Sequence, residues 1–138
     1  NAISYGAEGL SNATKTLEMA HNTVVSTRSG GAFLSIASGT TSVKLTANLF
    51  AGTGSPTFVT GGYAVGNAVQ ANNVTSVASN IPGASSIATP NFWPNATLQA
   101  LIALSVVPDA SYTQDAPPPY ILRGLPGSRK VGALQSAP

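Results

Sequence analysis

Apolar and polar residues alternate over short distances, which predicts β-strands along most of the chain. Three segments rich in β-branched and apolar residues are separated by turns that contain glycine; they are residues 22–28, 32–37 and 42–50. In the third segment Val43, Leu45, Ala47 and Leu49 alternate with polar residues, which is the two-residue period of a half-buried strand. The Gly-Gly and Ser-Gly separators are typical of hairpins, so we expect an antiparallel meander.

Further short apolar segments predict more strands; they are residues 57–60, 63–71 and 74–78. Turn signals spaced by about 8 to 12 residues are typical of β-sandwiches and barrels. The sequence therefore predicts a mainly β fold, an immunoglobulin-like or jelly-roll-like antiparallel sandwich with extended N- and C-terminal arms and at most one short helix. Residues 79–94 are expected to form a long surface loop.

Residues 97–107 fit two kinds of element. Apolar residues alternate from Leu98 to Val106 as they would in a strand, while Leu98 and Leu101 also begin a helical stripe with Asn95 as a potential N-cap. We favour a buried strand.

The two ends differ from the centre in composition. Residues 1–21 mix glycine and polar residues with isolated apolar ones, which predicts an N-terminal arm able to act as an exchanged strand. The apolar residues of this arm are Ile3, Tyr5, Leu10, Leu17 and Met19. Residues 22–115 would form the sandwich body. Residues 116–138 would form a basic, Pro-rich tail that begins with an extended polyproline stretch.

Few residues of the chain carry a charge. Only 7% are Asp, Glu, Lys or Arg while 43% are hydrophobic, whereas an ordinary soluble domain is roughly a quarter charged. Little repulsion therefore opposes close contact between copies. The cations of the tail, Arg123, Arg129 and Lys130, are the candidate contacts for a polyanion. Three cations neutralise few phosphates, so we do not expect a nucleic-acid partner.

The sequence offers little for catalysis or metal binding. It contains one histidine, His21, no cysteine and four carboxylates that are scattered along the chain. General acid–base catalysis needs titratable groups brought together, and a transition-metal site needs several His, Cys or carboxylate ligands. No G-x-S-x-G or EF-hand pattern is present. We predict that the protein is not an enzyme and has no catalytic residue, cofactor or metal ion.

Three sequons and a few aromatic residues are candidate modification and contact sites. The sequons, which would carry N-linked glycans, begin at Asn12, Asn73 and Asn95. Phe92, Trp93 and Tyr120 are candidate interface anchors, because large aromatic side chains dominate many association energies. No apolar run approaches the ~20 residues that span a bilayer. The chain begins without Met or a signal-like segment, so we expect a processed protein that is extracellular or on the cell surface.

These features together predict a structural protein. Low charge, β-strands and extended ends suit a subunit that self-assembles into an extracellular filament, in which an arm of one copy adds a strand to the next. In this general character the chain resembles subunits of bacterial pili with immunoglobulin-like domains, many of which contain cysteine. Its partners would be copies of itself, with covalent glycans as a modification.

Two alternatives stay open. One is a small viral or phage coat protein whose basic tail contacts the genome. The other is a secreted β-sandwich module that binds carbohydrate or surface ligands through Tyr63, Phe92 and Trp93.

Overall fold

The computed structural model describes residues 2–53, 57–86, 88, 91–103 and 131–132. These residues form nine short strands in three sheets of three strands each, and every pairing within the sheets is parallel. The strands are β1 (Ile3–Tyr5), β2 (Thr16–Ala20), β3 (Thr23–Ser26), β4 (Ala32–Ile36), β5 (Ser42–Thr46), β6 (Leu49–Gly52), β7 (Thr57–Thr60), β8 (Val69–Ala71) and β9 (Val74–Val77).

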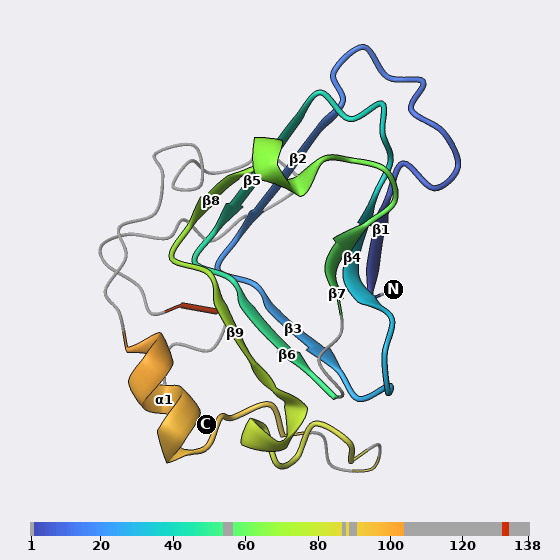
Figure 1. Cartoon of the computed structure of the whole chain (residues 1–138). Helices are drawn as coiled ribbons and strands as arrows, with labels where there is room; N and C mark the ends of the chain where they lie inside the picture. Colours follow the sequence, from blue (N-terminus) through green and yellow to red (C-terminus); the bar gives the residue numbers. More distant parts are fainter. Residues whose placement is uncertain (1, 54–56, 87, 89–90, 104–130, 133–138) are drawn as a thin grey trace, which may run out of the picture.

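Each sheet takes one strand from each of three successive turns of the chain. The sheets have the orders β1-β4-β7, β2-β5-β8 and β3-β6-β9. The first coil is therefore β1 to β3, the second β4 to β6 and the third β7 to β9. Viewed nearly end-on, the sheets form three walls around an interior (Figure 1). This architecture is a parallel β-helix, a solenoid of stacked coils.

The predicted antiparallel sandwich is wrong, although the fold is mainly β as predicted. Each strand pairs with the strand one coil away and not with its neighbour in sequence: Leu17 lies beside Val43, and Leu49 beside Val74. Within the described residues the only antiparallel contacts are isolated bridges outside the named strands. The glycine-containing turns carry the chain from one wall to the next, so they do not close hairpins.

Apolar side chains that point inward from the three walls form the interior. The buried members of this cluster are Met19, Val24, Phe33, Leu34, Ile36, Val43, Leu45 and Phe50. The rings of Phe33 and Phe50 lie 5.4 Å apart between centroids in a tilted arrangement. Parallel strands stack equivalent residues over one another, so the inward positions of successive coils form columns such as Met19–Leu45.

The predicted strand 42–50 is divided in two. Ala47 has a φ of 53°, a left-handed conformation that ends β5 and turns the chain into β6. As a result Val43 and Leu45 belong to the interior, whereas Ala47 and Leu49 belong to a second apolar cluster. The alternation is therefore real as far as Leu45, but the four residues do not share one face.

A short helix, α1 (Ala96–Ile102), lies outside the walls beside β9 (Figure 1). Leu98 and Ile102 of this helix are buried, and they pack with Leu49 and Ala51 from the outward face of β6. Asn95 caps the helix by accepting a hydrogen bond from the backbone N–H of Leu98 at 3.0 Å. The preference for a strand at residues 97–107 is thus wrong for residues 97–102; residues 104–107 lie outside the described part.

The predicted surface loop at 79–94 contains some regular structure. The 3₁₀ helix η2 (Ala78–Asn80) overlaps its beginning, and Gly83 forms an isolated antiparallel bridge with Asn91. A second 3₁₀ helix, η1 (Val65–Asn67), lies between β7 and β8, where the sequence predicted a strand from residue 63 onward.

Candidate functional site: the two ends of the solenoid

A ladder of three asparagines runs across the coils at one turn. This turn joins the second wall, β2-β5-β8, to the third wall, β3-β6-β9. Asn22, Asn48 and Asn73 occupy the equivalent position of each coil, with separations of 26 and 25 residues. The residue before each asparagine, His21, Ala47 or Asn72, has a φ between 53° and 57°. The left-handed residue points the asparagine that follows into the turn, where its amide can contact the coils on either side.

Every hydrogen-bonding group of the Asn48 amide has a partner. Its Oδ1 atom accepts from the backbone N–H of Asn22 at 2.9 Å and from Asn22 Nδ2 at 3.1 Å. Its Nδ2 atom donates to the backbone carbonyl of Met19 at 2.9 Å and to Asn73 Oδ1 at 3.0 Å. Because Asn48 is fully buried, these bonds stabilise the stacking of the coils.

The ladder ends with a donor at one end and an acceptor at the other. The Oδ1 atom of Asn73 accepts from the second coil, and its Nδ2 atom donates to the Leu45 carbonyl at 2.8 Å. No group in the described part of the chain accepts a hydrogen bond from the backbone N–H of Asn73. Likewise, none of the described residues donates to Asn22 Oδ1. These are the two groups that a further rung of the ladder would use.

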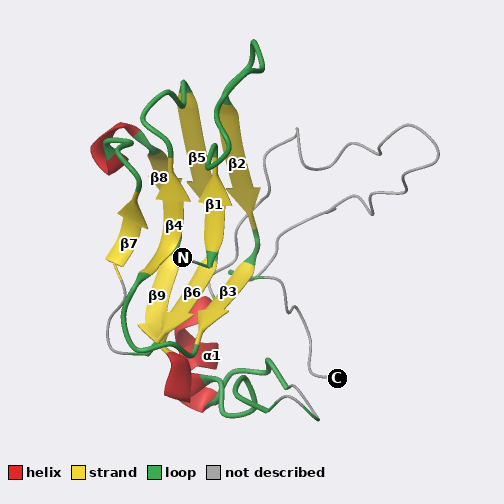
Figure 2. Cartoon of the chain, turned by 90° about the vertical axis from the view of Figure 1, so that its right-hand side faces the viewer, coloured by secondary structure: helices red, strands yellow, loops and turns green. Residues whose placement is uncertain are grey.

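The edge formed by β7, β8 and β9, the carboxyl-terminal edge, presents apolar and polar side chains to solvent. Val69 is 60% exposed, Val77 50% and Val65, in the adjoining η1, 38%. Gln70 lies beside Leu45 of the second coil, and Thr75 lies beside Phe50. Gln70 and Thr75 are exposed, whereas Leu45 and Phe50 are fully buried. Figure 2 shows this edge along one side of the molecule.

The opposite edge, formed by β1, β2 and β3, contains most of the residues predicted to act as an assembly arm. Ile3, Tyr5 and Leu17 are half-buried and pack on the interior cluster, and Met19 is buried within it. β1 and β2 pair with β4 and β5 of the same chain, so residues 3–5 and 16–20 are part of the first coil. Leu10, in the loop between β1 and β2, is half-buried beside Gly6 and Gly39.

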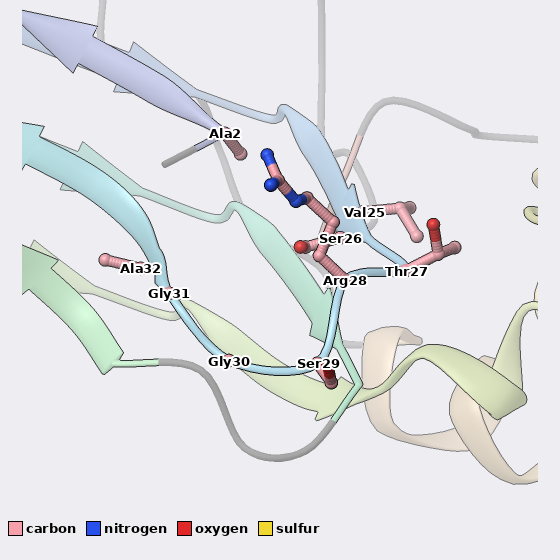
Figure 3. Close-up of a pocket in the computed structure, with 9 residues that line it drawn as sticks. All are labelled: Ala2, Val25, Ser26, Thr27, Arg28, Ser29, Gly30, Gly31 and Ala32. Atoms are coloured by element: carbon pink, nitrogen blue, oxygen red, sulfur yellow. The ribbon is translucent and has the colours of Figure 1, made fainter.

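A half-open pocket of about 460 Å³ lies at the turn between β3 and β4 (Figure 3). Its lining includes Arg28 with the hydroxyl-bearing Ser26, Thr27 and Ser29. The Arg28 side chain extends toward Ala2 across the pocket, and it is exposed. None of the described residues that line this pocket is a carboxylate, so the guanidinium is available to an anionic group.

The other predicted site residues that the structure describes lie in different segments. Phe92 is 44% exposed and Trp93 half-buried, in the segment before α1, away from the ladder. Of the three sequons, Asn12 is exposed in the loop before β2, while Asn73 belongs to the ladder and Asn95 caps α1. Tyr120, Arg123, Arg129 and Lys130 lie outside the described residues.

Residue patterns give no indication that Asn22 and Asn48 are structural, because a lone asparagine usually indicates a turn. The detectable signal is a repeat: at intervals of 25 or 26 residues an asparagine is followed by a residue that starts a strand, Thr23, Leu49 or Val74. Periods in this range are typical of solenoids.

Comparisons with protein-family models, with curated proteins and with solved structures gave no match for this chain. Among the described residues no helix has the length and apolarity to cross a bilayer. In the same residues no three His, Cys, Asp or Glu side chains cluster where they could hold a metal ion.

Proposed function

We propose that this protein is a non-catalytic structural subunit that self-assembles into an extracellular filament. The observation that carries the proposal is the pair of complementary edges on one short solenoid. Three parallel strands end the stack on each side, and no strand of the described chain pairs with their outer edges. Exposed strand edges with unpaired N–H and C=O groups favour pairing with another chain.

The surface of the third coil supports association in two ways. Another molecule that covers the edge removes part of the exposed surface of Val69 and Val77 from water, and each Å² of apolar surface that is buried contributes roughly 25 cal/mol. Charge does little to prevent such contact, since only 7% of the chain is charged. Proteins that stay monomeric usually protect sheet edges with charges, prolines or bulges.

The observed fold does not suit strand exchange by an N-terminal arm. An N-terminal arm that left the body would remove β1 and β2 from their places beside β4 and β5. Assembly through whole coil edges needs no such rearrangement, because both edges are already formed in the single chain. We therefore replace arm exchange with edge pairing between folded subunits.

Sedimentation velocity over a hundredfold range of concentration, with negative-stain microscopy of the concentrated sample, tests the function. We expect larger species to grow with concentration and to appear as unbranched filaments. A protein that sediments as a monomer throughout this range, with no particles in the micrographs, would falsify the filament function.

A second candidate function, binding of an acidic sugar, rests on the Arg28 pocket. Guanidinium groups bind carboxylates through paired N–H donors, and the neighbouring hydroxyl groups of Ser26 and Ser29 suit a sugar ring. Calorimetric titration with galacturonate, and with galactose as the neutral control, should give heat only for the acid. The Arg28→Gln variant should lose this heat; equal binding of both sugars, or of the acid to the variant, argues against this function.

A further inference from the structure

The two ends of the asparagine ladder differ in hydrogen-bonding character, and this difference gives the assembly a direction. At each rung the backbone N–H of one asparagine donates to Oδ1 of the asparagine in the following coil: Asn22 to Asn48 at 2.9 Å, and Asn48 to Asn73 at 3.0 Å. The Nδ2 atom of the later asparagine donates back to the earlier coil, as from Asn73 to the Leu45 carbonyl. The pattern is directional.

We propose that copies of this chain stack head to tail, so that the backbone N–H of Asn73 in one copy donates to Oδ1 of Asn22 in the next. This inference rests on the proposed function and adds the faces, register and polarity of the contact. Both groups are unused within the described residues, and each is the partner that the other lacks. The carboxyl-terminal edge of one copy thereby meets the β1–β3 edge of the next.

A second copy fits this edge because its first coil continues each wall in the same strand direction. β7, β8 and β9 of one copy would pair with β1, β2 and β3 of the next. These pairings would be parallel, like the pairings between coils inside the chain. In the second wall the column Glu18–Lys44–Val69 would continue with Glu18 of the next copy, which brings no like charges together. In the interior, Gln70 would be followed by Met19 of the next copy.

This contact is heterologous, since two different surfaces of the same chain meet, so it repeats without closing. Pairing two identical edges would instead give a dimer and would place the strands antiparallel across the junction. The asparagine ladder could not continue across such a junction. Two carboxyl-terminal edges would place two Asn73 N–H donors opposite each other, and two β1–β3 edges would place two Asn22 Oδ1 acceptors opposite each other. The hydrogen-bonding pattern favours the head-to-tail polymer.

A cysteine pair tests the register directly, and the natural chain contains no cysteine to interfere. In the proposed contact, position 69 of one copy is adjacent to position 18 of the next, on strands about 4.8 Å apart. That spacing allows a disulfide. The double variant Glu18→Cys/Val69→Cys should form a series of covalent multimers on oxidation, and the series should disappear on reduction.

The control pair is Ser4→Cys/Val69→Cys, in which the first cysteine lies in β1, on another wall. This control pair should give no series of covalent multimers on oxidation. Equal multimers from both pairs would overturn the proposal, as would a covalent dimer from Val69→Cys alone, because that dimer indicates two carboxyl-terminal edges in contact. Circular dichroism of each variant establishes that it is folded.

A pair of charge substitutions covers the case in which the cysteine variants fail to fold. Val77→Lys changes a 50% exposed residue on the carboxyl-terminal edge, and Leu101→Lys changes a 55% exposed residue on α1. We expect Val77→Lys to lower the association constant at least tenfold and Leu101→Lys to leave it unchanged. If the natural chain assembles but the two variants assemble equally, the stacking face is wrong while the filament function stands; a natural chain that never assembles contradicts both.

Discussion

Asn48 and Asn73 occupy equivalent positions in successive coils, and two nitrogen atoms of Asn48 donate to the same oxygen, Oδ1 of Asn73, each at 3.0 Å. One of these donors is the backbone N–H and the other is Nδ2. A single side-chain oxygen thus joins the turn and the side chain of the neighbouring coil. The central rung of the ladder has all its groups paired, so it should carry much of the stability of the coil stack.

Replacing Asn48 with alanine should therefore destabilise the fold strongly. The substitution removes the four hydrogen bonds that the fully buried Asn48 amide makes to Met19, Asn22 and Asn73, and each such bond contributes about 0.5–1.5 kcal/mol. We expect the free energy of unfolding in urea to fall by roughly 3 kcal/mol or more. Asn48→Asp should be comparably harmful, because a carboxylate cannot donate.

Asn12→Ala is the matched control, since Asn12 is an exposed asparagine in a loop. It should change the free energy of unfolding by less than about 0.5 kcal/mol. Similar urea midpoints for the Asn48 and Asn12 variants would show that the ladder contributes little.

Proline at two adjacent positions of β9 should separate assembly from folding. The backbone N–H of Val74 donates to the Asn48 carbonyl, so by the alternation of a parallel strand the Thr75 N–H points away from β6 and the Ser76 N–H points toward it. Thr75→Pro should then keep the melting temperature of the subunit but prevent filament growth. Ser76→Pro should lower the melting temperature, because it removes a bond within the chain.

These two variants are distinguished by thermal melting followed by circular dichroism and by sedimentation of the same samples. Filaments formed normally by Thr75→Pro would mean that this edge of β9 does not take part in assembly.

Deletion of residues 1–21 should unfold or greatly weaken the protein. The deletion removes β1 and β2, which leaves β4 and β5 as edge strands and exposes Leu34 and Leu45, both fully buried in the intact chain. If residues 1–21 were a free arm, the remaining chain would keep its far-ultraviolet spectrum and its cooperative melting. Retention of both properties would argue that the first coil is dispensable.

Glycan occupancy should differ among the three sequons. The glycan is attached to Nδ2, and this atom donates to the Leu45 carbonyl at 2.8 Å in Asn73 and to Asn80 Oδ1 at 2.9 Å in Asn95. Only Asn12, exposed in its loop, leaves this atom accessible among the three. Expression in a glycosylating host followed by peptide mass spectrometry should find a glycan at Asn12 alone; glycan on Asn73 in folded protein would contradict the ladder.

The sequence predicted where the strands lie better than how they pair. Strand positions follow from local patterns, and the segments 22–28 and 32–37 each contain a strand in the structure. Turn signals every 8 to 12 residues or so occur both in sandwiches and in a three-walled solenoid, where each coil has three strands and three turns. Local patterns therefore could not choose between antiparallel and parallel pairing.

The ladder shows what a residue-by-residue interpretation misses. Asn48 lies in the middle of an apparently regular alternating strand, and only its equivalence to Asn22 and Asn73 explains its burial. Leu98 and Ile102 were ambiguous for a related reason: a stripe of apolar residues fits either a strand or a helix until the surface that it covers is known. Contacts between residues far apart in the sequence decided both cases.

X-ray diffraction from oriented filaments tests the central claim most directly. Strands in this solenoid run across the stacking axis and repeat along it at about 4.8 Å. Head-to-tail stacking of coils therefore predicts a strong reflection near 4.8 Å along the filament axis. Filaments that diffract at this spacing only across the axis, or that lack the reflection, would contradict assembly through the coil edges.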